Sequence, residues 1–243
     1  MSDYFEIDFL DVETAKSGDA IALRYTIGGE VFIHVVDGGF KHTGQKVAEH
    51  IRLYYNNPSF IDNVVVTHND GDHSCGLRTI LEEFDVGALW MLRPWVYAEQ
   101  LINRFASYSN VDNLTRRLRV AYSNLAALED IAQRRGIPIF EPFQGTQIGA
   151  FTVMAPSRAL FFDMVVASDK TPEPVKEAAF DSLGGFMVEV AQKVVALVKM
   201  AWGDERFSTE ETAAENEMSV VQYANLCGKK ILLTGDTGRK GLQ

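Results

Sequence analysis

A short polar turn between a buried strand and a helix, over residues 64–77, constrains the fold of this chain more than any other feature. The three consecutive valines of residues 64–66 favour a buried strand, and helical spacing begins at Gly76. A strand end followed by a tight turn projects its side chains into one cleft, and Gly71 lets the backbone turn there. Two histidines and two aspartates fall within six residues of this turn, 68–73: His68, Asp70, Asp72 and His73.

These four side chains are suited to binding divalent metal ions. Imidazole and carboxylate ligands together suit Zn²⁺, Mn²⁺ or iron, and two aspartates supply the negative charge that a site for two ions needs. The alternative is a turn rich in Asp and Asn that caps the following helix, since these residues favour turns for backbone reasons alone. Two of the five histidines lie here with aspartates between them, so we favour the metal site.

The rest of the chain alternates strands with helices. Helical spacing predicts helices over 45–54 and 76–84, and residues 157–203 are expected to be mostly helical. Strands are predicted over 4–12, 20–27, 31–36, 64–66, 88–92, 138–143, 150–155, 219–223 and 230–233. Such alternation is typical of a layered α/β architecture.

Composition and motifs exclude several classes of protein. The 243 residues carry 23 basic and 33 acidic side chains, and a net charge of −10 disfavours non-specific binding to nucleic acid or anionic membranes. Charged side chains interrupt the most apolar stretch, 186–201, and the N-terminus is acidic, so we expect neither a membrane span nor a signal peptide. Two cysteines cannot form a disulfide framework. The motifs of serine hydrolases and P-loop nucleotide hydrolases are absent from the sequence. We therefore expect a soluble, cytoplasmic protein.

The polar turn resembles the signature motif of a known family. His-X-Asp-X-Asp-His is similar to the His-X-His-X-Asp-His motif of the metallo-β-lactamase-fold hydrolases. Aspartate in the second position resembles the branch that contains the hydrolase domain of bacterial competence DNA-uptake channel proteins. Further landmarks of that branch are matched in order by residues 9–12 with 18–20, 35–39, 151–156, 216–221 and 231–236.

This resemblance covers nearly the whole chain and implies its architecture. The expected fold is a four-layer αβ/βα sandwich of two mixed sheets, with helices on both outer sides and the cleft at the strand ends. Residues 1–243 are expected to form one domain, with residues 97–135 as a helical insert.

Carried over position by position, the resemblance implies up to two divalent ions, Zn²⁺ or Mn²⁺. The first ion would be bound by His68 and Asp70, the second by Asp72 and His73, and Asp236 would bridge the two. Independently of the resemblance, Asp236 lies at a strand end inside Gly-Asp-Thr-Gly, a sequence that is otherwise typical of a plain β-turn.

The sequence departs from the family pattern in its histidines. The pattern has one at the end of the middle strand, where this chain has Ala155, and another beyond the bridging aspartate. No histidine follows His73, and Gln243 is reached seven residues after Asp236. The competence branch tolerates the first absence. The second leaves two alternatives: a native chain that continues past Gln243, or a second ion that is weakly held.

The activity implied by the resemblance is hydrolysis of phosphodiesters by a metal-activated water, in a nuclease or a nucleotide phosphodiesterase. Two ions about 3.5–4 Å apart lower the pKa of water and clamp the attacking and leaving oxygens. We expect Asp72 to orient that water. Asp37, at the turn after the second strand of the family pattern (residues 35–39), would support the site, and His42 is a candidate substrate contact.

The predicted insert has two features of its own. From Val111, apolar residues follow at alternating spacings of four and three: Leu114, Leu118, Ala121, Leu125, Leu128 and Ala132. We favour a surface helix or helical hairpin packed on its own domain, and the alternative is contact with a second copy or a partner protein. The stretch is also locally basic. A solvated face is the simpler interpretation, and a phosphate guide the sharper one, for Arg116, Arg117 and Arg119.

A competing hypothesis is a non-catalytic or partner-dependent scaffold of the same fold, within a multi-protein bacterial system. The missing final histidine and the heptad pattern motivate it. The presence of all five ligands named above, His68, Asp70, Asp72, His73 and Asp236, favours the enzyme, because a site without metal has no physical need to hold like charges together.

Overall fold

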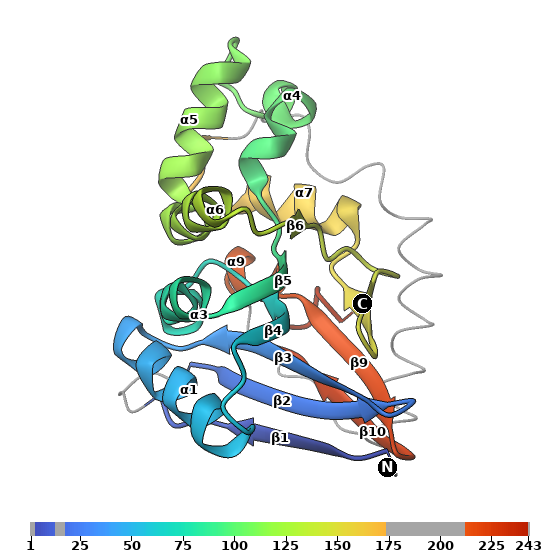
Figure 1. Ribbon diagram of the computed structural model, residues 1–243. Helices are drawn as coiled ribbons and strands as arrows, with labels where there is room; N and C mark the ends of the chain where they lie inside the picture. The colour runs from blue at the N-terminus through green and yellow to red at the C-terminus, as the bar shows by residue number, and fades with distance from the viewer. Residues whose placement is uncertain (1–2, 13–17, 174–211, 243) are drawn as a thin grey trace.

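Two β-sheets pack against each other in the computed structural model, which describes residues 3–12, 18–173 and 212–242 (Figure 1). The first sheet has the strand order β1-β2-β3-β4-β5-β6, and the second has the order β10-β9-β8-β7. Rings from both sheets meet between them, because Phe151 contacts Tyr25 and His34 at centroid distances of 6.1 and 5.0 Å. The predicted two-sheet α/β sandwich is confirmed.

The first sheet is mixed. It consists of β1 (Phe5–Phe9), β2 (Ala20–Ile27), β3 (Glu30–Gly38), β4 (Phe60–Val65), β5 (Asp85–Trp90) and β6 (Ile139–Phe140). Strands β1 to β3 pair antiparallel, and the β2–β3 hairpin turns through Gly28 and Gly29, whose φ values of 60° and 88° suit a tight turn of two residues. Strands β3 to β6 pair in parallel, so β3 and β4 both end at the same edge of the sheet.

The second sheet is antiparallel over its described strands. These are β7 (Gln147–Ile148), β8 (Phe151–Ala155), β9 (Val221–Leu226) and β10 (Lys229–Leu233). The sheets are linked beside the ends of β3 and β4, where the amide of Val220 donates to the carbonyl oxygen of Thr67 at 3.1 Å. Segments from both sheets therefore meet at that edge.

Helices α1 (Lys41–Tyr54) and α3 (Leu77–Glu83) pack on the first sheet and on each other (Figure 1). Between β4 and α3 lies the single-turn helix α2 (Gly71–Ser74), which carries part of the polar turn. Close packing of backbones fixes this region. A Cβ atom added to Gly76 would lie 1.8 Å from the carbonyl oxygen of Gly38, so only glycine fits there.

The segment 94–135 is helical but interrupted. It contains the 3₁₀ helices η1 (Pro94–Tyr97) and η2 (Ile102–Arg104) and the α-helices α4 (Ala98–Leu101), α5 (Val111–Ala121) and α6 (Ser123–Arg135). The heptad pattern suggested one helix, whereas the chain breaks at Tyr122, with φ −108° and ψ 50°. All but Ala121 of the heptad residues are buried within the chain, in agreement with packing on its own core.

Two further helices complete the described chain, α7 (Arg158–Ala167) and α9 (Ala214–Glu217). The helical segment predicted over 157–203 is described only as far as residue 173, and the apolar stretch 186–201 lies outside the described residues. Among the helices that the structure does describe, none is long and apolar enough to cross a membrane.

Candidate metal centre

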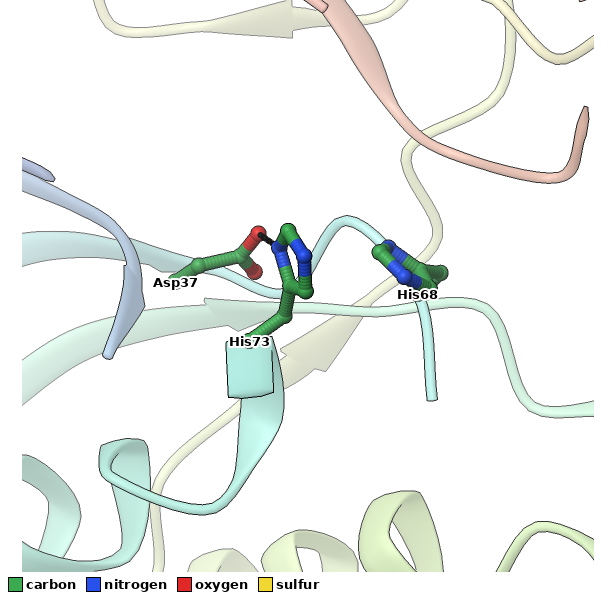
Figure 2. A group of neighbouring side chains, drawn as sticks. All are labelled: Asp37, His68 and His73. Atoms are coloured by element: carbon green, nitrogen blue, oxygen red, sulfur yellow. Dashed lines mark hydrogen bonds and ion pairs between the residues drawn. The ribbon is translucent and has the colours of Figure 1, made fainter. Parts of the chain in front are cut away.

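The polar turn lies at the edge where β3 and β4 end. Asp37 is at the end of β3, His68 follows β4, and His73 is carried by α2. Figure 2 shows the carboxylate of Asp37 directed at the ring of His73, with the ring of His68 beyond it. The two imidazole rings are 4.3 Å apart between centroids. The parallel pairing of β3 with β4 therefore brings together residues that are more than thirty positions apart in sequence.

Asp37 is fully buried and fully hydrogen-bonded. Its carboxylate accepts from the backbone amide of Thr67 at 2.8 Å, from the hydroxyl of Thr67 at 2.5 Å, and from Nδ1 of His73 at 2.9 Å. The residue has a φ of 55°, a left-handed conformation that Asp and Asn adopt more readily than most residues. Although Asp37 lies within ligand distance of His68 and His73, its hydrogen bonds identify it as the group that orients His73.

His73 has one ring nitrogen fixed and the other free of hydrogen bonds. With Nδ1 donating to Asp37, Nε2 carries the lone pair in the neutral ring; it lies 3.3 Å from Oδ2 of Asp236, at ion-pair distance but without a hydrogen bond. Burial alone would lower the pKa of His73, but the carboxylates of Asp236 and Asp37 outweigh burial and raise it to about 11. The same contact lowers the pKa of Asp236.

His68 has the same arrangement with different partners. Its Nδ1 lies 2.9 Å from the hydroxyl oxygen of Thr67 and 3.3 Å from that of Ser219, whereas Nε2 is buried without a hydrogen bond. Burial, followed by the neighbouring charge of His73, lowers the pKa of His68, so this ring is neutral at pH 7. At pH 7 the site without metal thus contains one positively charged imidazolium, that of His73, and one neutral imidazole, that of His68.

The two free Nε2 atoms fit a bound metal ion. Buried polar atoms are nearly always hydrogen-bonded, and each one that is not requires an explanation. Metal-binding histidines commonly donate a hydrogen bond from the N–H of the other ring nitrogen to a carboxylate or another acceptor, as His73 does to Asp37. The residues present are therefore suited to hold a divalent cation.

Asp70 and Lys170 lie at the outer side of this pair of rings. Oδ2 of Asp70 is 3.9 Å from Nε2 of His68, which brings together the two ligands predicted for a first ion. Oδ1 of Asp70 accepts from the ammonium group of Lys170 at 2.9 Å. A cation at His68 would therefore share this half-buried carboxylate with a lysine.

The loop that carries Asp19 lies against the backbone of Asp72. A Cβ atom added to Gly18 would lie 2.3 Å from the carbonyl oxygen of Asp72, so the loop before β2 lies directly on the turn. Within the described residues, the half-buried carboxylate of Asp72 has no hydrogen bond or ion pair. Asp19 lies within ligand distance of His73 and Asp236, and its pKa is raised by burial and then by the charges of neighbouring aspartates.

The remaining predicted residues lie outside this cluster or at its border. Asp236 also accepts from the side-chain amide of Asn216 at 3.4 Å. His42 is exposed on α1 and stacks on Phe40, and Ala155 is buried among apolar side chains and offers no ligand.

Of the three arginines, Arg116 and Arg117 are exposed and line an open pocket of about 590 Å³ together with Asn110 and Asn113. Arg119 differs, because it pairs with Glu129 and with Asp130 and stacks over Trp95. Its charge is already balanced within the chain.

Three residues of the site were not among those predicted. Asp19 stood next to a glycine before a strand, a local signal that could have indicated a role at a strand end. Lys170 and Ser219 reach the site across 100 and 151 positions of sequence; nothing near Lys170 in the sequence points to the site, whereas Ser219 lies within the family landmark at residues 216–221.

Comparisons with known proteins add little to this geometry. No protein-family model matches the chain, and no curated protein matches it. One similar solved structure is described as hydrolase AbOPH in the β-lactamase superfamily: 14% identity and a TM-score of 0.36, over 56% of this chain and 48% of that one. Another is a protein of Thermotoga maritima described as a metallo-β-lactamase, with 9% identity and a TM-score of 0.34 over 61% of this chain and 65% of that one. The chain thus spans about half to two thirds of the solved structures it matches, and likenesses this low say nothing about its activity.

Proposed function

We propose that this protein is a metal-dependent hydrolase that uses a metal-activated water. The observation that supports the proposal is the pair of buried Nε2 atoms of His68 and His73, each without a hydrogen bond while the other ring nitrogen is held. Carboxylates of Asp70 and Asp236 lie beside them, at a sheet edge where segments from both sheets meet.

The roles of the residues follow from their contacts. His68 with Asp70, and His73 with Asp72, would hold up to two divalent ions, Zn²⁺ or Mn²⁺, with Asp236 between them. Such ions supply a polarised ester and a water of lowered pKa. Asp37 keeps the proton of His73 on Nδ1, which leaves the Nε2 lone pair free to bind. Asp72, without a hydrogen bond or ion pair among the described residues, is available to orient the attacking water.

For the substrate we propose a phosphodiester, in a nucleic acid or a nucleotide. The support is the resemblance of the polar turn to the competence branch, to which the solved structures add nothing. Arg116 and Arg117 are exposed and line an open pocket with amide side chains, a chemistry that suits phosphate oxygens. Arg119 is not included, because two carboxylates already hold it.

The scaffold hypothesis loses part of its support. The heptad residues that suggested a partner helix are mostly buried against the chain's own core, as Leu114, Leu118 and Leu128 are. A partner or a second copy would have to use other surfaces of the 97–135 helices. We also propose that residues 1–243 form one domain with these helices as an addition.

The test combines metal analysis with hydrolysis assays on the full chain. We expect at least one divalent ion per chain, and Mn²⁺- or Zn²⁺-dependent cleavage of single-stranded DNA, RNA or a chromogenic phosphodiester. His68→Ala should remove the ion held by that histidine and abolish the cleavage. The matched control is His50→Ala, since His50 pairs with Asp8 away from the site.

The outcomes separate the parts of the proposal. Less than one ion per chain after dialysis against the metal would overturn the metallohydrolase. Cleavage of only a lactone or a β-lactam would overturn the phosphodiester substrate and leave the metallohydrolase standing. Full metal loading without hydrolysis of any of these substrates would favour the scaffold.

A further inference from the structure

Asp19 lies in the loop just before β2, far in sequence from the polar turn, yet its carboxylate reaches the turn's second histidine. The ligand atoms of Asp19, His73 and Asp236 all lie within 4.8 Å of one another. We propose that Asp19 is a further protein ligand, beside Asp72, of the cation that binds His73 and Asp236. The inference rests on the proposed function, because it presupposes that a cation binds at this site.

The backbone of Asp19 is fixed from two directions. Its carbonyl oxygen accepts from the amide of Gly39 at 2.8 Å, in the turn that follows Asp37. On the other side, Gly18 lies so close to Asp72 that any side chain at position 18 would clash with backbone atoms. Asp19 is therefore placed by the same strand end and turn that place His73, which a ligand position requires.

The side chain of Asp19 lies among charged groups that do not hydrogen-bond to it within the described part of the chain. It is half-buried, and among the described residues no hydrogen bond or ion pair reaches its carboxylate. Carboxylates withdrawn from water are normally paired or bound to a metal. The free Nε2 of the fully buried His73 is a second, independent sign that a ligand belongs between these groups.

Charge supports the same assignment. Asp19, Asp37 and Asp236 all lie within ligand or hydrogen-bond distance of His73, and even a protonated His73 would balance only one of these three carboxylates. A divalent cation balances two. His73, Asp19 and Asp236 offer one nitrogen and two oxygen ligands, which suit Zn²⁺ or Mn²⁺ and leave coordination positions open for Asp72 and water. This set needs no histidine beyond His73.

The experiment compares wild type, Asp19→Asn and the control Asp3→Asn as metal-free full chains. Asp3 is exposed, so its substitution changes the charge equally without touching the site. Calorimetric titration with Zn²⁺ and with Mn²⁺ gives affinity and stoichiometry, and thermal melting is measured in chelator and with saturating metal. We expect Asp19→Asn to weaken binding at one site by at least about 10-fold, the lower end of what removing even an outer partner of a metal ligand costs.

Melting separates a ligand from a structural residue. Without metal, Asp19→Asn removes repulsion between carboxylates, so its melting temperature should equal or exceed that of wild type. With metal, it should melt below wild type, because part of the stabilisation by binding is lost. Asp3→Asn should behave as wild type in both conditions.

Three results would overturn the inference. If wild type binds metal and Asp19→Asn binds it equally tightly, Asp19 is no ligand and the proposed function still stands. If Asp19→Asn melts lower or fails to fold in chelator as well, its role is structural. If wild type binds neither cation, this inference and the proposed metallohydrolase fail together.

Discussion

Replacing Asp37 with asparagine should weaken both the fold and the metal site, and the two effects can be measured separately. Asparagine has the shape of aspartate and tolerates the φ of 55° at this position. The substitution therefore leaves the backbone undisturbed. It removes the negative charge and replaces one carboxylate oxygen with an NH₂ group. What changes is the hydrogen bonding of a carboxylate that is fully buried.

The cost follows from the three hydrogen bonds that Asp37 accepts, two from Thr67 and one from His73. The amide oxygen of asparagine can keep the bond from the Thr67 amide, but its NH₂ group then faces the other two donors. A hydrogen bond to a charged group contributes about 1.5–3 kcal/mol and a neutral one about 0.5–1.5 kcal/mol, so exchanging two such bonds costs about 2–4 kcal/mol. For a chain of this size that corresponds to a melting temperature lower by roughly 4–16 °C.

The metal site should weaken for a different reason. When the NH₂ group of residue 37 donates to Nδ1 of His73, the ring proton moves to Nε2, which then has no lone pair for a cation. Loss of such an orienting partner costs about 10–100-fold in metal affinity. Melting in chelator and calorimetric titration of the metal-free protein measure the two effects independently.

The matched control is Asp62→Asn. Asp62 lies on β4 of the same sheet and accepts one hydrogen bond, from the amide of Ile33 at 2.7 Å, which an amide oxygen can also accept. We expect a loss of no more than about 1 kcal/mol there, and unchanged metal affinity. If Asp37→Asn melts and binds metal as this control does, the orienting role assigned to Asp37 is wrong.

Three further predictions concern packing, protonation and charge. Gly76→Ala should lower the melting temperature by at least about 2–12 °C, since overpacking against backbone costs at least about 1–3 kcal/mol, whereas Gly71→Ala meets nothing closer than 3.5 Å and should be tolerated. Metal affinity should rise with pH between about 6.5 and 11, because the cation displaces the proton of His73, whose pKa is raised to about 11. In chelator, the charged ring of His73 stabilises the fold fully below pH 6.5, and this contribution is lost as the pH rises toward 11. Calorimetry in buffers of different ionisation enthalpy measures the released proton, and a pH-independent affinity contradicts this assignment. Lys170→Met should leave melting nearly unchanged, because its ion pair with Asp70 is exposed, and should tighten metal binding at His68; weaker binding would show that the lysine supports the site.

The regular elements near the site could be predicted because their signals are local. The strand over 20–27 has the predicted bounds, and the Gly28-Gly29 hairpin forms as expected. The break at Tyr122 could not be predicted. The two halves of the heptad run pack on different elements, α5 on η1 and α6 on α3, while both keep their apolar residues inward. A periodic pattern reports which side is buried and does not report what buries it.

The candidate metal-site residues show the same difference between local and long-range signals. His68, Asp70, Asp72 and His73 could be found together because one turn carries them all. Lys170 comes from a segment whose own sequence gives no reason to place it there, and Ser219 lies in a landmark of the resemblance that was given no role at the site; both positions depend on how the whole chain packs. Asp19 is intermediate, because its Gly-Asp step before a strand was visible in the sequence but its meeting with His73 was not.

The protonation of the two imidazoles separates the enzyme from the scaffold on physical grounds. A chain selected only for stability is best served by a protonated His73 between Asp37 and Asp236, and the contacts of the metal-free site favour that state. Asp19 and Asp72 then stay half-buried, with no hydrogen bond or ion pair to compensate among the described residues. Neutral residues at those positions would relieve the repulsion without disturbing His73. A single proton therefore leaves carboxylates unbalanced in this site, and a cation of charge two, in its place, would balance one more of them.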